Sequence, residues 1–472
     1  MRRRRAAPAE RFHSEQDAGV PKRFALPWLA RRLRLLLGPL RGRQLCVAYS
    51  GGLDSTVLLA ALAGLKSREH FVLRALHVDH RLQAQSGAWA GAARTRARAL
   101  RVPCAIIRVN VRRARGQSPE AAARQARYRA LARRLGRDEL LLTAHHQEDQ
   151  LETVLLALLR GSGVRGLSAM GGLTPWAHTC LVRPLLPVSR AQLERYARSH
   201  RLDWSEDPSN LDLRFDRNYL RRAVLPVIRE RWPAAAGTAS RSAGHLAEAA
   251  VLLEQLARDA LRQARDGQAM RVSVLRRLSP GERRNAVRAW ISERGLPQPD
   301  HRRLREICGP MLEARLDAIP AVAWAGGELR RHGDRLFAVV AVADQNMRRS
   351  LRWDWRAQPW LSLPGGGAIG LVRDRHGDVW LGGLPRLLSV RARRGGERLR
   401  LQQGRATLKD LLQAQAVVPW ERAGVPLITH AGRILAVADL WLDGSCRPSH
   451  PGMPDRGRFR WRRAADKISA RD

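Results

Sequence analysis

The chain has 472 residues, which allows about two to four domains with buried cores. Its formal net charge of +42 and pI near 11.7 favour phosphate-rich partners, above all nucleic acid; an arginine-rich proteome with a solvated basic surface is the alternative source of this charge. Its five cysteines form no CxxC pair and no zinc-type cluster, and no apolar run has the length of a membrane span. These features exclude a disulfide scaffold, a zinc finger and a transmembrane protein, and we expect a cytoplasmic location.

Strands and helices alternate after a basic N-terminal segment, residues 1–24, which we expect to be a disordered tail or an overlong gene start. The predicted strands cover residues 45–49, 71–78, 102–109 and 139–143. The predicted helices cover residues 27–37, 56–62, 83–100, 118–135 and 147–160. This alternation predicts an α/β domain over residues 25–230, built on a doubly wound parallel sheet.

The sequence Ser50-Gly51-Gly52-Leu53-Asp54-Ser55 lies between the first predicted strand and the helix that follows it. Its glycines allow a tight turn and a close approach to a ligand, and the N–H groups that begin the helix favour a phosphate. Ser50 and Ser55 can add hydroxyl donors. Asp54 would repel a phosphate, so we expect it to hold Mg²⁺ or to cap the helix. The lysine of a GxxxxGK[ST] loop is missing, and a plain Gly-Gly turn is the alternative interpretation.

Polar clusters also end the second and fourth predicted strands, at residues 77–80 and 144–146. Ligands of doubly wound sheets bind beyond the carboxyl ends of the strands, so we expect these clusters and the glycine loop to share one crevice. The helix that follows carries Glu148, Asp149 and Glu152 at spacings that allow a shared face. These acids could bind Mg²⁺ or a cationic amine, or could simply favour the helix dipole.

Arg124 and Arg127 lie on one face of the helix predicted at residues 118–135, where they could neutralise ATP phosphates or form a solvated basic surface. Residues 165–188 are predicted to be rich in loops. Ala- and Leu-rich segments then predict a mainly helical middle domain, residues 231–385, with strands in its later part.

The last predicted domain, residues 386–465, is small and of the α+β type. Its basic side chains, with Trp420 nearby, would suit docking of an RNA. They are Arg393, Arg394, Arg398, Arg400 and Arg405.

Six motifs stand in a characteristic order along the chain. They are SGGLDS (50–55), HVDH (77–80), EAAARQARY (120–128), TAHHQEDQLET (143–153), RPLL (183–186) and EDPSN…FDRNYLR (206–221). In this order they resemble the tRNA(Ile)-lysidine synthase family of the PP-loop, or N-type ATP pyrophosphatase, superfamily. The stretches GGERLRL, TLKDLLQ, VPWERAGVPLI and ILAVADLW resemble the terminal domain of that family. Glu148 stands where the family is expected to have Asp, which keeps the charge but lengthens the arm.

The resemblance implies a reaction in two steps. ATP with Mg²⁺ adenylates the carbonyl oxygen on carbon 2 of the wobble cytidine in tRNA(Ile) with a CAU anticodon. The ε-amine of free L-lysine then attacks this carbon and displaces AMP, so the products are lysidine, AMP and pyrophosphate. No membrane partner is expected.

The resemblance also implies roles for individual residues. The nucleotide-binding residues would be Ser50, Gly51, Gly52, Leu53, Asp54, Ser55, His77 and Arg127, with Asp54 as the metal ligand. The catalytic residues would be Asp54, Arg124, His145, Asp149, Glu152 and Arg217. Arg124, Arg127 and His145 are candidates for the phosphate. Asp149 and Glu152 could bind the lysine ammonium and then accept its proton, and Arg217 with Arg221 could hold the α-phosphate or the target nucleotide.

Other interpretations stay open at this point. Another PP-loop tRNA-modifying enzyme, such as a cytidine 2-thiolase, would need cysteine pairs to carry sulfur or an iron–sulfur cluster, and the sequence has none. GMP or asparagine synthetases would need an ammonia source, and there is no glutaminase motif. An RNA-binding protein with an inactive nucleotide site is disfavoured by the intact SGGLDS sequence and the acid-rich helix.

Overall fold

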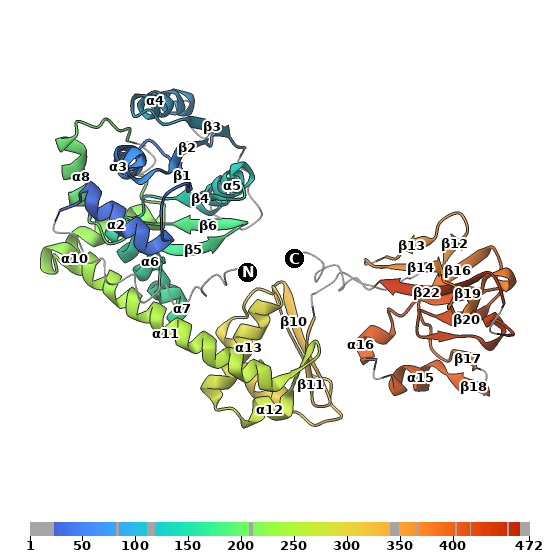
Figure 1. The fold of residues 1–472 in the computed structure, drawn as a ribbon. Helices are drawn as coiled ribbons and strands as arrows, with labels where there is room; N and C mark the ends of the chain where they lie inside the picture. Colours follow the sequence, from blue (N-terminus) through green and yellow to red (C-terminus); the bar gives the residue numbers. More distant parts are fainter. Residues whose placement is uncertain are drawn as a thin grey trace. The chain divides into compact units, whose positions relative to one another are not determined.

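The computed structural model describes residues 23–81, 85–110, 119–206, 211–339, 349–364, 366–401, 404–415, 417–450 and 453–462. The chain forms two compact units, residues 1–256 and 257–472 (Figure 1). Of the predicted N-terminal tail, residues 1–22 lie outside the described part, whereas Phe24 is buried against Trp28 and Tyr196. The starts of the helices predicted at residues 83 and 118 also lie outside it.

The first unit contains a six-stranded sheet in the order β3-β2-β1-β4-β6-β5. Its strands are β1 (Gln44–Ala48), β2 (Val72–Asp79), β3 (Cys104–Arg108), β4 (Glu139–Leu142), β5 (Leu173–Trp176) and β6 (Thr179–Val182). All neighbouring pairs are parallel except β5 and β6, which pair antiparallel. The predicted parallel α/β sheet is confirmed. The loop-rich prediction for residues 165–188 is wrong where this hairpin forms, because its four-residue strands lack the apolar run that marks the others.

Helices cover both faces of this sheet, and shorter helices follow along the chain of this unit. They are α2 (Leu26–Leu37), α3 (Leu53–Glu69), α4 (Ser86–Ala99), α5 (Pro119–Arg134), α6 (Gln147–Leu159), α7 (Val164–Leu167), α8 (Arg190–Ser199), α9 (Asp216–Tyr219), the π-helical turn η3 (Leu220–Val224) and α10 (Leu225–Arg231). Leu45 and Val47 of β1 enter the core formed with α2, α3, α4 and α8, whereas Cys46 packs with α5. Cys46 is thus part of the core, and its burial raises the pKa of the thiol to about 12.

The strand order determines where the ligand crevice of this sheet lies. The chain extends the sheet from β1 to β2 and β3 on one side, and places β4 and β6 on the other. Connections therefore diverge between β1 and β4, which opens a crevice at their carboxyl ends. The glycine loop follows β1 and the histidine pair follows β4, so both lie at this point.

The second unit begins within α11 (Ala235–Ala264), the long helix that contains the division between the units. Its first part contains α12 (Val272–Arg277), α13 (Pro280–Glu293), α14 (His301–Glu306) and the π-helical turn η4 (Ile307–Met311). The sheet of this part comprises β7 (Arg265–Asp266), β8 (Ala269–Arg271), β11 (Arg335–Val339), β10 (Gly327–His332) and β9 (Ala321–Trp324), in that order. The prediction of a mainly helical region with strands in its later part is thus confirmed, and β7 and β8 are two strands that it did not include. Trp290, Leu329 and Leu336 lie in the core between the helices and the sheet.

The remainder is rich in β-structure. One sheet contains β12 (Leu351–Asp354), β16 (Leu387–Arg391), β19 (Leu427–His430), β20 (Arg433–Val437) and β21 (Trp441–Leu442). The other contains β13 (Trp360–Ser362), β14 (Ala368–Arg373), β22 (Arg456–Arg462) and β15 (Val379–Trp380). The hairpin β17 (Arg398–Leu401) and β18 (Gly404–Thr407) precedes α15 (Leu408–Ala414) and α16 (Pro419–Arg422).

Strands on either side of residue 386 pair with each other in both sheets, β12 with β16 and β14 with β22. The domain limits expected at residues 24, 230 and 385 stay predictions. Among the described residues, no helix combines the length and the apolar character that crossing a bilayer requires.

Candidate active site

The glycine loop is held in shape by hydrogen bonds from two other segments. Gly51 has a φ of 84°, a left-handed conformation that favours glycine. Its carbonyl accepts from the Ser205 N–H at 2.9 Å and from Arg96 Nη1 at 3.3 Å. The hydroxyls of Ser50 and Ser55 lie 2.9 Å apart, so the structure brings the two predicted donors together. The start of α3 therefore presents a pre-formed turn of N–H groups suited to a phosphate.

Asp54 lies in the first turn of α3 with one of its oxygens unused. Its Oδ2 atom is 3.7 Å from both His146 Nε2 and Arg190 Nη1. Its Oδ1 atom is buried and has no hydrogen-bond partner among the described residues. Magnesium is usually held by one or two carboxylates together with substrate phosphates, and no cluster of three or more metal-binding side chains occurs within the described ranges. Asp54 thus fits a magnesium ion whose coordination a nucleotide would complete.

His146 is buried among three carboxylates. Its Nδ1 donates to Glu148 at 2.9 Å, and its Nε2 lies 3.4 Å from Asp149 and 3.7 Å from Asp54. Burial alone would lower the pKa of this ring, but Asp149, Asp54 and Glu148 outweigh it and raise the pKa to about 10. His146 is therefore a fixed cation. The sequence pattern indicated the neighbouring His145 as the functional residue and gave no sign of this role for His146.

His145 has the opposite character. Its Nδ1 shares a hydrogen bond of 2.8 Å with Thr143 Oγ1. Burial, together with the charges of Arg183, Arg124 and Arg217, lowers its pKa to about 3 despite Asp149. If His145 contacts a phosphate as predicted, it does so as a neutral hydrogen-bond partner and supplies no charge.

The three acids of α6 have different partners. Glu148 accepts from the Arg190 N–H at 2.9 Å and lies 3.5 Å from Arg229, so it faces α8 and α10. Asp149 and Glu152 share Arg221 instead. Arg221 donates to both oxygens of Glu152, at 2.7 and 3.1 Å, and to Asp149 at 3.1 Å. The predicted common face thus holds for Asp149 and Glu152, while Glu148 anchors His146.

The pKa values of Asp149 and Glu152 are shifted in different directions. Burial would raise the pKa of Asp149, but the charge of His146, its backbone N–H and Arg221 hold this pKa below its usual value. For Glu152, burial prevails over Arg221 and raises the pKa. Two neighbouring carboxyls are therefore tuned in opposite directions, which is typical of an acid–base site.

The remaining predicted residues have other partners. Arg217 donates to Thr153 at 3.4 Å, and the Arg124 guanidinium lies 5.2 Å from the ring centroid of Tyr128. His77 Nδ1 bonds the Tyr49 carbonyl at 2.9 Å, and burial lowers its pKa, with a further contribution from the charge of Arg127. Arg96 and Arg190 contact the loop but were missed, because single arginines carry no signal in a chain so rich in them.

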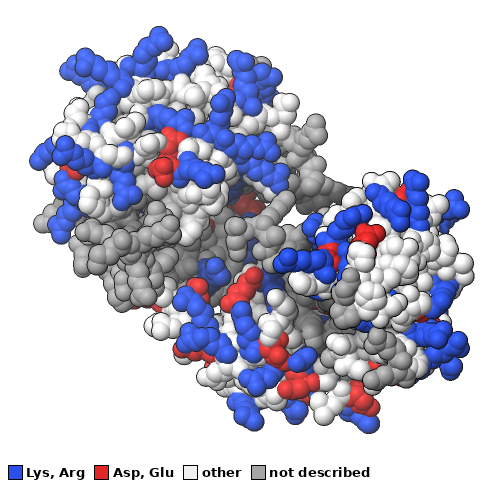
Figure 2. All heavy atoms as spheres, turned by 45° about the vertical axis from the view of Figure 1, so that its right-hand side comes forward, with Lys and Arg blue, Asp and Glu red and all other residues white. Residues whose placement is uncertain are grey.

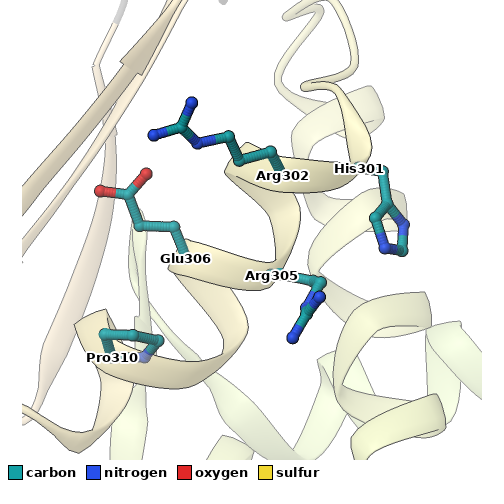
Figure 3. Close-up of a pocket in the computed structure, with 5 residues that line it drawn as sticks. All are labelled: His301, Arg302, Arg305, Glu306 and Pro310. Atoms are coloured by element: carbon teal, nitrogen blue, oxygen red, sulfur yellow. The ribbon is translucent and has the colours of Figure 1, made fainter.

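A surface hollow lies in the first part of the second unit. It has a volume of about 330 Å³ and is lined by His301, Arg302, Arg305, Glu306 and Pro310. Figure 3 shows that all five side chains come from one helical stretch, with His301 and Arg305 on the opposite side from Arg302 and Glu306. It is a basic surface hollow, and its lining includes neither the glycine loop nor the acids of α6.

The fold and site define a PP-loop nucleotide-binding protein with two appended domains. The family described as "PP-loop domain" matches residues 26–228, "TilS substrate binding domain" matches residues 270–337, and "TilS substrate C-terminal domain" matches residues 388–455. The chain is 45% identical to the tRNA(Ile)-lysidine synthase of Alkalilimnicola ehrlichii, over 87% of this chain and 92% of that protein. The enzyme of the same name from Pseudomonas aeruginosa is 43% identical over 88% and 94%. The chain belongs to the tRNA(Ile)-lysidine synthase family.

Replacing Asp54 tests its assignment as the metal ligand. Asp54→Asn keeps the size of the side chain and removes the charge that would hold Mg²⁺. We expect Mg²⁺-dependent ATP binding, measured by calorimetry, to weaken by about 100-fold, or about 2.8 kcal/mol. ATP binding without Mg²⁺ should not weaken, because the variant lacks the carboxylate that would repel a phosphate. The exposed Asp203→Asn is the matched control. Equal Mg²⁺ stimulation in Asp54→Asn and wild type would contradict the assignment.

The fixed charge of His146 predicts a pH dependence of stability. Its pKa in the folded protein, about 10, lies above its ordinary value of 6.5. Its stabilising contribution is therefore complete below about pH 6.5 and is lost as the pH rises toward about 10. Denaturant unfolding across this range should show a loss of stability in wild type that His146→Gln lacks. The exposed His200→Gln is the control and should follow wild type; parallel profiles for wild type and His146→Gln would refute a charged ring.

Proposed function

We propose that this protein uses ATP to join L-lysine to carbon 2 of the wobble cytidine in tRNA(Ile) with a CAU anticodon, and releases AMP and pyrophosphate. One observation carries the proposal: His146 contacts Asp54 of the glycine loop and Asp149 of the acid-rich helix at once. A nucleotide bound by the loop and an amine bound by the acids would therefore meet in one crevice. The relatives named tRNA(Ile)-lysidine synthase support the choice of substrate.

The first half of the reaction needs charge neutralisation around the α-phosphate. A carbonyl oxygen is a poor leaving group, and its adenylation converts it into part of AMP, which departs readily. The N–H groups of the loop would bind the phosphates, and Arg124 and Arg217 supply positive charge near His145. Asp54 would hold Mg²⁺, which, when bound, supplies further neutralisation of the phosphate charge.

The second half needs a neutral amine. The ε-ammonium of lysine has a pKa of about 10.4, so a base must remove a proton before attack. Asp149 is a weak base because His146 and Arg221 stabilise its charge, which suits it to hold the ammonium. Glu152 has a raised pKa and is the stronger proton acceptor. We therefore assign binding to Asp149 and proton removal to Glu152.

The competing chemistries lack support in this chain. A thiolase needs accessible thiolates, whereas Cys46, Cys308 and Cys446 are buried. Burial raises the pKa of Cys104, and Cys180, which is half-buried, has no second cysteine near it in the sequence to form a pair. An inactive nucleotide site would be expected to have lost the loop geometry, but the hydrogen bonds of Gly51, Ser50 and Ser55 are in place.

The C-terminal part of the second unit offers two basic surfaces for the tRNA. Arg398, Arg400 and Arg405 are exposed on the β17–β18 hairpin, whereas Arg393 lies 3.5 Å from Glu397. Figure 2 shows Lys and Arg at many places on the visible surface, with smaller groups of acids between them. Such surfaces bind phosphate backbones in a salt-dependent manner.

Strand β22 provides the second surface. Arg456, Arg458, Arg460 and Arg462 alternate along it and so share one face of the sheet. Arg460 and Arg462 are exposed. The Arg462 guanidinium stacks 3.8 Å from the ring centroid of Trp360, so an aromatic surface and a fixed cation stand together, as in single-strand and phosphate binding sites.

Removal of two charges tests the β22 surface. We expect the double variant Arg460→Ala, Arg462→Ala to bind tRNA about tenfold more weakly, and its slope of log affinity against log salt to be smaller by about 1.4 to 1.8. The control Arg373→Ala, Arg386→Ala removes two exposed charges that pair with Asp455 and Asp354. Fluorescence anisotropy over a salt series measures both, and equal slopes for the two double variants would exclude a specific role of β22.

Incorporation of radiolabelled lysine tests the function itself. Purified protein with Mg-ATP and unmodified tRNA(Ile) bearing a CAU anticodon should yield labelled tRNA and equimolar AMP. The same tRNA with uridine at the wobble position is the control and should stay unlabelled. AMP without label would indicate another nucleophile, and neither product would favour an RNA-binding protein.

A further inference from the structure

Arg221 occupies the acidic pair that the proposed function assigns to lysine. Its Nε donates to Glu152 Oε1 at 2.7 Å, and its Nη2 bridges Glu152 Oε2 and Asp149 Oδ1, both at 3.1 Å. A guanidinium that forks across two carboxylates in this way uses the acceptor positions an ammonium would need. The site is thus already filled by a cation from the chain itself.

Because Asp149 and Glu152 are buried beneath Arg221, a second cation cannot reach both carboxylates. The Glu152 side chain is 0% exposed and that of Asp149 is 12% exposed, whereas Arg221 is 38% exposed. Arg221 therefore lies on the solvent side of the two acids. An incoming ammonium cannot contact both carboxylates while the guanidinium stays in place.

The charges of the neighbouring side chains also indicate that lysine must replace Arg221 and cannot bind beside it. Asp149 and Glu152 carry two negative charges, and His146 already lies 3.4 Å from Asp149. With Arg221 present, both carboxylates already have a cation in hydrogen-bond contact, so a lysine ammonium would add a further positive charge. Displacement of the Arg221 guanidinium by the ammonium of free lysine keeps the net charge of the site unchanged. One cation replaces another, so neither buried acid loses its counter-ion.

The backbone that carries Arg221 is suited to such an exchange. Arg221 lies in the π-helical turn Leu220–Val224, between α9 and α10. Single π-helical turns occur often at functional sites, and a change between π and α geometry re-aims a side chain without unfolding the helix. The buried Leu220 and Leu225 anchor the turn on either side of Arg221.

We propose that Arg221 is a placeholder for the substrate ammonium, and that L-lysine binds by displacing its guanidinium from Asp149 and Glu152. This inference rests on the proposed function and adds to it a criterion for the amine substrate. Only a ligand whose cationic head replaces these hydrogen bonds can open the site. Norleucine, which has the length of the side chain without the amine, cannot.

Lysine binding to the full-length protein tests the placeholder, with calorimetry as the readout. Arg221→Ala frees both acids, so we expect it to bind L-lysine at least about tenfold more tightly than wild type. Arg222→Ala removes the same charge from the next, exposed residue and should bind as wild type does. Norleucine should bind to none of the three proteins. Weaker or unchanged lysine binding in Arg221→Ala would overturn the proposal, since Arg221 would then be a fixed part of the site.

A second variant covers the case in which the unpaired acids prevent folding. Arg221→Lys keeps a tethered cation, so it should fold like wild type and bind free lysine no more tightly. If Arg221→Ala does not fold, Arg221→Gln retains a donor for one carboxylate and should show the tighter binding in its place. Tight binding by Arg221→Lys, or its absence in Arg221→Gln, would overturn the placeholder.

The incorporation assay separates this proposal from the function on which it rests. Wild-type protein that incorporates lysine, combined with an Arg221→Ala variant that does not bind lysine more tightly, removes the placeholder alone. Wild-type protein that incorporates no lysine, with no lysine binding by any variant, removes both.

Discussion

The imidazolium of His146 is the contact on which the charge arrangement of the crevice depends. It joins Asp54 at the start of α3 to Glu148 and Asp149 at the start of α6, at distances between 2.9 and 3.7 Å. Three carboxylates this close would repel one another, and their pKa values would rise without a cation between them. Because the ring is buried and held on both nitrogens, its proton is fixed, and the acids stay ionised beside a site for a phosphate.

The adjacent His145 is also buried, but its ring is neutral. His145 faces Arg124, Arg183 and Arg217, so both the loss of water and the nearby cations disfavour its protonation. Two identical side chains, next to each other in the sequence, thus become a permanent cation and a neutral ring. The contrast recurs between Asp149, which is kept ionised, and Glu152, whose pKa is raised. A reaction that requires both ammonium binding and deprotonation can use such a pair.

Much of the fold followed from local signals. The apolar runs predicted β1 to β4, because the strands of a parallel sheet between layers of helices carry apolar side chains in near-continuous runs. Ser50 to Ser55 marked the phosphate-binding turn. The hairpin β5–β6 escaped prediction, since strands of four residues with Thr174, Pro175 and Thr179 have no distinctive pattern. The spacing of Asp149 and Glu152 predicted their shared face, but not that Arg221, some seventy residues later, would fill it.

By itself, the sequence determined the class of fold, the phosphate loop, the acids of α6 and the family, because each of these depends on residues close together in the chain. The tertiary structure alone decided the protonation states of His145 and His146, the unused oxygen of Asp54, the stacking of Arg462 on Trp360 and the occupancy of the acidic pair by Arg221. Charge states and ion pairs depend on which distant side chains share a low-dielectric space. Burial and long-range contacts set that environment, and neither is encoded in local spacing.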